Sequence, residues 1–250
     1  MANLKDQIAT ELLRTKSLPV SQPWLDNFLS SSSTAQRNTP LPALTRTALF
    51  RILTSDFRES LASRNATILP VDIADPNVQE RRLPGCIPVQ VLDIEDIGTS
   101  AWSQIEAIER VERGETVRGR EIVRTVNIGG DEDQGGATGS GNRATAACTN
   151  AGMDADANES GGPHRLVLQD AKGTRVMGIE MKKITGFAIG RLSIGAKLLL
   201  RDSTVARGMV LLTPENVTLL GGKIEAMDQA WKTGRKERLL EKINGTGGGT

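Results

Sequence analysis

The chain has 250 residues, of which 38% are hydrophobic, so it is long enough for one or two domains with a buried core. Lys and Arg number 31 against 30 for Asp and Glu, a net charge of +1 that does not indicate strong electrostatic binding of the whole chain to nucleic acid. No apolar run approaches the roughly 20 residues of a membrane span, and the N-terminus lacks the pattern of a signal peptide, so we expect a soluble intracellular protein.

The first part of the chain has helical periodicity. Apolar residues recur at three- and four-residue spacing in three segments, and Pro19, Pro23 and Pro42 separate the segments or open them. We therefore predict a bundle of three short helices over residues 1–68. The apolar positions of the three segments are Leu4, Ile8 and Leu12, then Trp24, Leu25, Phe28 and Leu29, then Leu49, Leu53, Phe57 and Leu61.

Beyond a proline-containing connector, residues 69–84, the apolar period changes from about 3.6 to 2, as in β-strands. Turn residues separate the resulting short segments, and a helix interrupted by Gly234 follows from Lys223 onwards. Five short strands favour a small barrel of OB type over residues 69–244, with a disordered tail at 245–250. The expected strands are 87–91, 166–169, 175–182, 197–201 and 208–212, with 217–220 extending the last. The fold class is thus α+β.

A long insertion, about residues 101–163, follows the first expected strand. It begins with a helix, for which Ser103 and Glu106 form a capping-box pattern, and residues 120–128 are strand-like. Residues 129–162 contain nine glycines and no Val, Ile, Leu, Phe, Trp or Tyr, which predicts disorder. Loops of this length are usually functional or disordered.

Residues for catalysis or metal binding are scarce. His164 is the only histidine, and we expect it to face solvent beside Pro163. Gly139-Ser140-Gly141 has the letters of a nucleophile motif but does not lie on a strand-to-helix turn. Cys86 and Cys148 are expected to be free thiols in a reducing compartment. We therefore predict a protein without catalytic residues, metal or cofactor.

Two kinds of binding remain open. Exposed aromatic residues over a basic groove are typical of OB barrels that bind single strands, and the expected strands contain no Tyr or Trp. The basic side chains that could contact phosphates are Lys182, Lys183, Arg191 and Lys197, although a solvated outer face is the favoured interpretation. The apolar residues of the insertion that indicate a protein partner instead are Trp102, Ile105, Ile122 and Val126.

The stretch from Arg207 to Gly222 resembles the signature of the RecQ-mediated genome instability protein family. Its core is Leu-Leu-Thr-Pro-Glu-Asn-Val, followed by Leu-Gly-Gly. Further matches follow in order along the chain. They are Trp24-Leu25, Ser103-Gln104-Ile105, the hairpin from Leu166 to Gly178, and Ile194 to Lys197.

The resemblance implies a nuclear, non-catalytic subunit that binds topoisomerase III, a type IA enzyme, and a RecQ-family helicase, and that contacts DNA weakly or indirectly. Such a complex dissolves double Holliday junctions, and the inserted loop modulates the gate of the topoisomerase. The chain resembles the short fungal form of the family. The alternative is a stand-alone OB module that binds single-stranded DNA.

Overall fold

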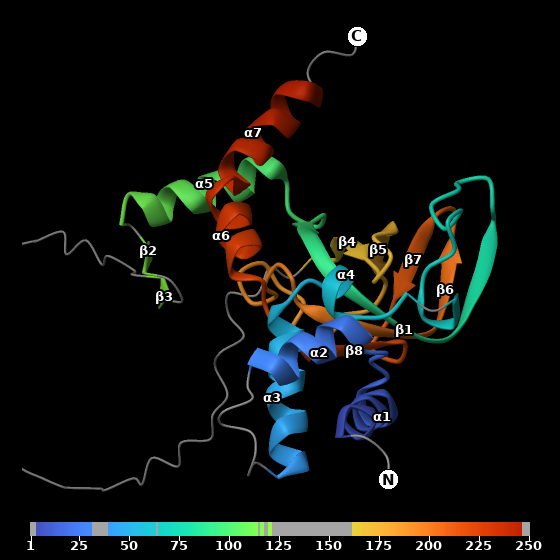
Figure 1. The fold of residues 1–250 in the computed structure, drawn as a ribbon. Coiled ribbons are helices and arrows are strands. Elements are labelled where there is room, and N and C mark those ends of the chain that lie inside the picture. Colours follow the sequence, from blue (N-terminus) through green and yellow to red (C-terminus); the bar gives the residue numbers. More distant parts are fainter. Residues whose placement is uncertain are drawn as a thin grey trace, which may run out of the picture.

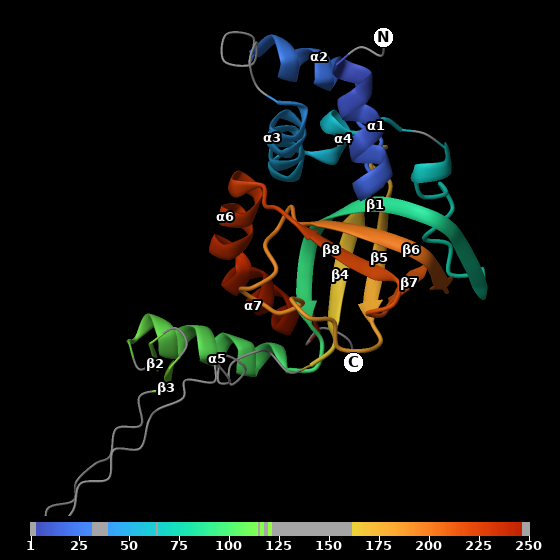
Figure 2. The same cartoon turned by 90° about the horizontal axis from the view of Figure 1, so that it is seen from below.

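The computed structural model describes residues 4–31, 40–63, 65–114, 116–117, 120–121 and 162–246. Helices lead into a closed β-barrel, and two further helices follow it (Figure 1). The N-terminal helices and the helix of the insertion lie at opposite ends of the barrel (Figure 2). The predicted fold class, helices followed by an OB-type barrel and a helical C-terminus, is confirmed.

The N-terminal helices are α1 (Leu4–Lys16), α2 (Gln22–Ser31), α3 (Leu41–Thr54) and the short α4 (Phe57–Ser60). Their apolar faces form one core because buried residues recur at four-residue spacing, as at Ile8 and Leu12. The predicted stripe that continues from Leu49 to Leu61 is wrong. Helix α3 ends at Thr54, and the Asp56 side chain accepts a hydrogen bond from the Arg58 backbone N–H as the N-cap of α4.

The barrel is closed by hydrogen bonds between its first strand and two neighbours. Strand β1 (Glu80–Asp96) pairs antiparallel with both β4 (His164–Gln169) and β6 (Lys197–Ala206). Strand β5 (Arg175–Glu180) pairs with β4, and also in parallel with β7 (Met209–Leu212), which pairs with β6. The strand order around the barrel is therefore β1-β4-β5-β7-β6, returning to β1.

Two strands differ from the prediction. Strand β1 begins at Glu80, inside the expected connector, and its register with β6 shifts between Leu83 and Cys86, where Gly85 has a φ of 82°. Strand β8 (Val217–Gly221) does not extend β7 but pairs antiparallel with β6. The Asn216 side chain forms the turn between β7 and β8, accepting from the Thr213 N–H at 2.9 Å and donating to the Leu211 carbonyl at 2.8 Å.

The C-terminal part forms two helices, α6 (Glu225–Thr233) and α7 (Arg235–Thr246), with Gly234 between them. Met227 and Trp231 pack against the barrel core, as their helical spacing predicts. Helix α7 continues through residues 245 and 246, so the expected disordered tail does not begin at 245.

The described part of the insertion contains α5 (Ala101–Glu112) and a two-stranded ladder of β2 (Thr116–Val117) and β3 (Arg120–Glu121). The capping box predicted at Ser103 is wrong, because the N-cap is Ser100, whose hydroxyl accepts from the Ser103 N–H at 3.2 Å. The rest of the strand expected at 120–128, and the segment 129–161, lie outside the described residues.

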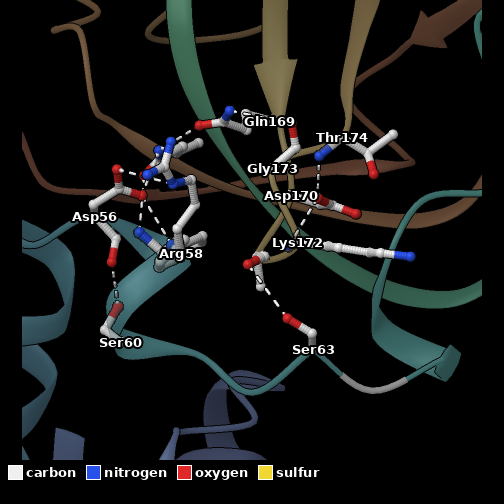
Figure 3. A network of polar contacts seen from close by, with 12 residues as sticks. Asp56, Arg58, Ser60, Ser63, Gln169, Asp170, Lys172, Gly173 and Thr174 are labelled. Atoms are coloured by element: carbon white, nitrogen blue, oxygen red, sulfur yellow. Dashed lines mark hydrogen bonds and ion pairs between the residues drawn. The ribbon is translucent and has the colours of Figure 1, made fainter. Parts of the chain in front are cut away.

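The N-terminal helices meet the barrel at a junction whose polar contacts include Asp56, Gln169 and Asp170 (Figure 3). Ala171, in the predicted turn between β4 and β5, is buried in the core of the N-terminal helices, and Leu220 of β8 packs against it. Buried Asp170 forms the turn, accepting from the N–H groups of Lys172 at 3.0 Å and Thr174 at 2.8 Å. The barrel is therefore joined to the helices by interdigitated side chains as well as by the connecting chain.

Candidate partner-binding site

The insertion leaves and rejoins the barrel at one point, the neck, formed by Gly98 and Gly162. A Cβ added to Gly98 would lie 2.5 Å from the Gly162 Cα, so the two backbones are in contact. The Ile97 N–H donates to the Pro163 carbonyl at 3.0 Å, and Asp96 pairs with His164 in the β1–β4 register. The barrel therefore fixes both ends of the insertion.

Beyond the neck, polar groups fix the direction of α5. Buried Asp96 accepts from the N–H groups of Gly98 at 2.8 Å and Thr99 at 3.1 Å, which shapes the turn before the helix. The buried Gln104 amide donates to the Asp96 carbonyl at 3.0 Å and to the Thr99 carbonyl at 3.0 Å. These bonds hold the first turn of α5 at the rim of the barrel, and its far end projects from the rim (Figures 1 and 2).

Helix α7 supports α5 from the side. Lys236 of α7 forms ion pairs with Glu112 at 2.7 Å and Glu109 at 3.3 Å. Arg235 donates to the Gln104 side-chain oxygen at 3.1 Å. The orientation of α5 thus depends on the C-terminal helices as well as on β1.

An apolar groove of about 490 Å³ lies between the root of α5 and α7; we call it the Trp102 groove. Trp102 is 67% exposed, an unusual fraction for tryptophan, and Ile97 is 41% exposed. Aromatic residues are enriched among those that carry the binding energy of protein interfaces. The side chains that give the groove its apolar character are Ile97, Trp102, Leu239 and Ile243.

Of the four residues predicted to bind a protein partner, Trp102 lies on this surface. Ile105 is 4% exposed, because it is on the face of α5 that is packed against the protein. Ile105 therefore positions the helix, and a partner does not reach it in this conformation. Ile122 and Val126 lie outside the described residues.

The basic residues of the nucleic-acid alternative do not all lie on the surface. Lys182, Lys183 and Arg191 are exposed, and Lys182 forms an ion pair with Glu215 at 3.2 Å. Lys197 has no exposed surface, so its assignment to a solvated outer face is wrong. A phosphate group outside the barrel cannot contact it.

Lys197 lies instead at the junction between barrel and helices. Its ammonium donates to the Gln90 side-chain oxygen at 2.8 Å and lies 4.6 Å from the centre of the Phe57 ring. Burial lowers the pKa of Lys197 to about 7, and the negative charge of Asp56 opposes this shift. The apolar run from Leu198 to Leu200 was the sequence signal for this burial.

The prediction that His164 faces solvent is also wrong. His164 is 2% exposed, and its Nδ1 lies 2.6 Å from Glu180 Oε2. The Glu180 carboxylate also accepts from the backbone N–H groups of His164 at 3.0 Å and Ile184 at 2.7 Å. This pair fixes the point where the chain re-enters the barrel, which explains a buried histidine without catalysis.

Within the ranges that the structure describes, no three His, Cys, Asp or Glu side chains gather as a metal ion would require. No described helix has the length and apolarity to cross a bilayer. Cys86 is a partly buried free thiol, as predicted, whereas Cys148 lies outside the described residues.

Two family models match this arrangement of helices and barrel. The model described as "RMI1, N-terminal OB-fold domain" matches residues 69–235, and "RMI1, N-terminal helical domain" matches residues 12–60. The chain belongs to the RMI1 family. The resemblance seen in the sequence is thereby confirmed. The matched RMI1 barrel domain includes the neck and α5, whereas Leu239, Lys242 and Ile243 of the Trp102 groove lie beyond its end.

Two curated proteins are similar to this RMI1 chain, and both are named RecQ-mediated genome instability protein 1. The one from Schizosaccharomyces pombe is 29% identical over 97% of this chain and 97% of its own length. The one from Xenopus laevis is 24% identical over 90% of this chain, which spans 35% of the frog protein. The match to the yeast protein extends over both the helical and barrel parts.

Proposed function

We propose that this protein is a non-catalytic adaptor in genome maintenance that binds topoisomerase III and a RecQ-family helicase in the nucleus. In this role it promotes the dissolution of double Holliday junctions. Membership of the RMI1 family and the names of the two relatives, which refer to RecQ and to genome instability, support the proposal. A direct contact with DNA is at most weak.

The observation that carries the proposal is the exposed Trp102 at the root of the insertion. Trp102 is 67% exposed and lines an apolar groove with Ile97, Leu239 and Ile243, so the apolar surface at this place is a patch and not a single side chain. Trp102 lies on a helix that the neck, Gln104 and Lys236 hold in a fixed direction, so little entropy is lost when a partner binds there. We infer that the topoisomerase docks at this root while the rest of the insertion modulates its gate.

We expect Trp102→Asp to weaken binding to purified topoisomerase III by about 30-fold, since truncated interface tryptophans often cost about 2 kcal/mol or more. Decatenation by the reconstituted complex should fall with the same variant. The measurements are biolayer interferometry for affinity and a decatenation time course for activity.

The matched control is Phe50→Asp on α3. Phe50 is 68% exposed, so this substitution removes an equally exposed aromatic side chain far from the insertion. Equal loss of affinity in both variants would remove the support that Trp102 gives. A salt series with a single-stranded oligonucleotide tests the alternative, since tight binding with a steep salt slope would favour a stand-alone DNA-binding module.

A further inference from the structure

A second cleft, of about 330 Å³, lies between β1, α6 and α7 beside the Trp102 groove; we call it the basic cleft. Four cationic and two carboxylate side chains line it, so the lining carries a charge of +4 − 2 = +2. This excess contrasts with the near-neutral chain as a whole. The charged residues are Arg165, Arg235, Arg238, Lys242, Asp93 and Glu95.

Other groups of the cleft already engage both carboxylates. Glu95 forms ion pairs with Arg165 and with Lys242, so one carboxylate serves two cations. Asp93 accepts a hydrogen bond from the Trp231 indole N–H at 2.5 Å. Neither carboxylate therefore neutralises Arg235 or Arg238.

The two arginines are held by neutral groups. Partly buried Arg235 donates to the Gln104 side-chain oxygen, and Arg238 donates to the Trp231 carbonyl at 2.8 Å. Their guanidinium carbons lie 5.8 and 5.5 Å from the centre of the Trp231 ring. Across the described part of the chain, neither arginine forms an ion pair with a carboxylate.

A cation that is partly withdrawn from water without an ion-pair partner is unfavourable, and this applies to the partly buried Arg235; Arg238 is exposed. At Arg235, burial lowers the pKa of the guanidinium, while the charge of Asp96 opposes the shift. An external anion in the cleft would add the direct ion pair that Asp96 does not form with Arg235. Arginine is well suited to this task, because its planar donors match an oxyanion in a bidentate arrangement.

The surroundings favour a protein carboxylate over a nucleic-acid phosphate. The basic cleft and the Trp102 groove share Gln104, Leu239 and Lys242, so cationic and apolar surfaces are continuous. The Trp231 ring already has two guanidinium groups against it, which leaves it poorly placed for stacking on a base.

We propose that the basic cleft and the Trp102 groove together bind one acidic segment of a partner protein, with a carboxylate at Arg235 and Arg238 and an apolar side chain against Trp102. The identity of the partner rests on the proposed function, which makes it topoisomerase III. The lining of the cleft and the groove adds to that function the character of the docking segment, which is acidic and carries an apolar side chain.

The test uses the full chain and purified topoisomerase III. We expect Arg238→Glu to weaken binding by about tenfold or more, and Arg238→Ala by less, because reversal adds repulsion to the loss of attraction. Affinity of the unaltered chain should fall between about 50 and about 300 mM salt, and the Arg238→Glu variant should show a smaller fall. The matched control is Arg82→Glu, at an exposed arginine near the start of β1, and we expect its affinity for topoisomerase III to be unchanged.

Three other results would each overturn the inference, and they can be told apart. If the unaltered chain and Arg238→Glu bind topoisomerase III equally, the cleft is not a docking site, although the proposed function stands. If the unaltered chain does not bind the topoisomerase, both proposals fall. If Arg238→Glu loses binding to a single-stranded oligonucleotide while binding to topoisomerase III is unchanged, the cleft takes nucleic acid instead.

Discussion

At the scale of single residues, Lys197 shows how the fold uses a cation inside the molecule. The Lys197 ammonium donates to the Gln90 side-chain oxygen, and the same oxygen accepts a hydrogen bond from the Phe57 N–H at 3.0 Å. The Gln90 amide in turn donates to Asp56 at 2.9 Å and to Gln169 at 3.1 Å. One glutamine thus connects the barrel with the start of α4.

The lowered pKa of Lys197 predicts that stability depends on pH. The unfolded chain holds this proton up to a pKa near 10.5, whereas the folded chain releases it near 7. Between these values the unfolded state binds more protons, so the free energy of unfolding rises with pH. We expect the stability of the unaltered chain relative to Lys197→Met to rise by about 2 kcal/mol from pH 7 to pH 9.

Urea denaturation of both proteins at several pH values measures this difference. Gln90 keeps its bond from the Phe57 N–H in the methionine variant, so the substitution leaves no buried oxygen without a donor. Parallel stability curves for the two proteins would show that Lys197 stays protonated in the folded state.

Residues of this kind were the hardest to predict from the sequence. Burial of Lys197 depends on Gln90, which is 107 positions away, and burial of His164 depends on Glu180. The apolar run from Leu198 to Leu200 indicates a buried strand around Lys197, but composition and periodicity carry no information on the distant partners that allow a lysine or a loop histidine to be buried. Partner binding was predicted for Trp102 and Ile105 alike; Trp102 is exposed and the prediction stands for it, whereas Ile105 is buried.

At the scale of elements, the end of β8 illustrates why two successive glycines are needed. Gly221 and Gly222 have φ values of 84° and 89°, in the left-handed region that other residues enter with strain. The surroundings of the two differ. A Cβ on Gly222 would lie 2.3 Å from the Leu53 carbonyl oxygen of α3, whereas one on Gly221 would meet nothing within 4 Å.

This difference predicts unequal effects of two alanine substitutions. Gly221→Ala should cost about 1 kcal/mol of stability, since only backbone strain is added. Gly222→Ala should cost about 3 kcal/mol or more, because α3 or β8 has to move as well. Chemical denaturation measures the free energy of unfolding of both variants. Equal losses of stability would mean that α3 moves away from the added methyl group of Gly222→Ala at little cost.

The strands of the barrel were predictable because apolar and polar residues alternate along a strand that has one buried face. In β5 the burial alternates residue by residue through Val176, Gly178 and Glu180. The beginning of β1 was missed because its first residues are mostly exposed and include Pro84 and Gly85. Strand β8 was predicted as an extension of β7. Alternation of apolar and polar residues does not reveal which strand a segment pairs with, so it could not show that the four-residue turn after β7 leads into a separate strand that pairs with the first residues of β6.

At the scale of the whole molecule, the neck separates the insertion from the barrel. Because Gly98 and Gly162 are in contact, the barrel does not depend on the insertion to bring β1 and β4 together. The sequence indicated the long insertion from its composition. It could not indicate the neck, because the contact joins residues 64 positions apart.

We expect replacement of residues 129–161 by a short Gly-Ser linker to change the free energy of unfolding by less than about 1 kcal/mol. Loop-closure entropy varies only by about 0.6 kcal/mol for each doubling of loop length. Decatenation by the complex should decline in the same variant if the insertion modulates the gate. Urea denaturation and a decatenation assay measure the two effects separately.

Gly98→Ala is the matched variant for the neck, since the added methyl group would collide with the Gly162 backbone. We expect this single substitution to destabilise the protein more than removal of the whole segment 129–161. The reverse order would show that the insertion, and not the neck, supports the barrel.

The burial of Ala171 in the helical core also bears on how the protein is made. A ribosome releases the N-terminal helices first, and domains commonly fold in that order during synthesis. Here the core of those helices includes Ala171 and is covered by Leu220, both of which emerge long after α4. The N-terminal helices therefore complete their core only after Ala171 and Leu220 of the barrel have left the exit tunnel.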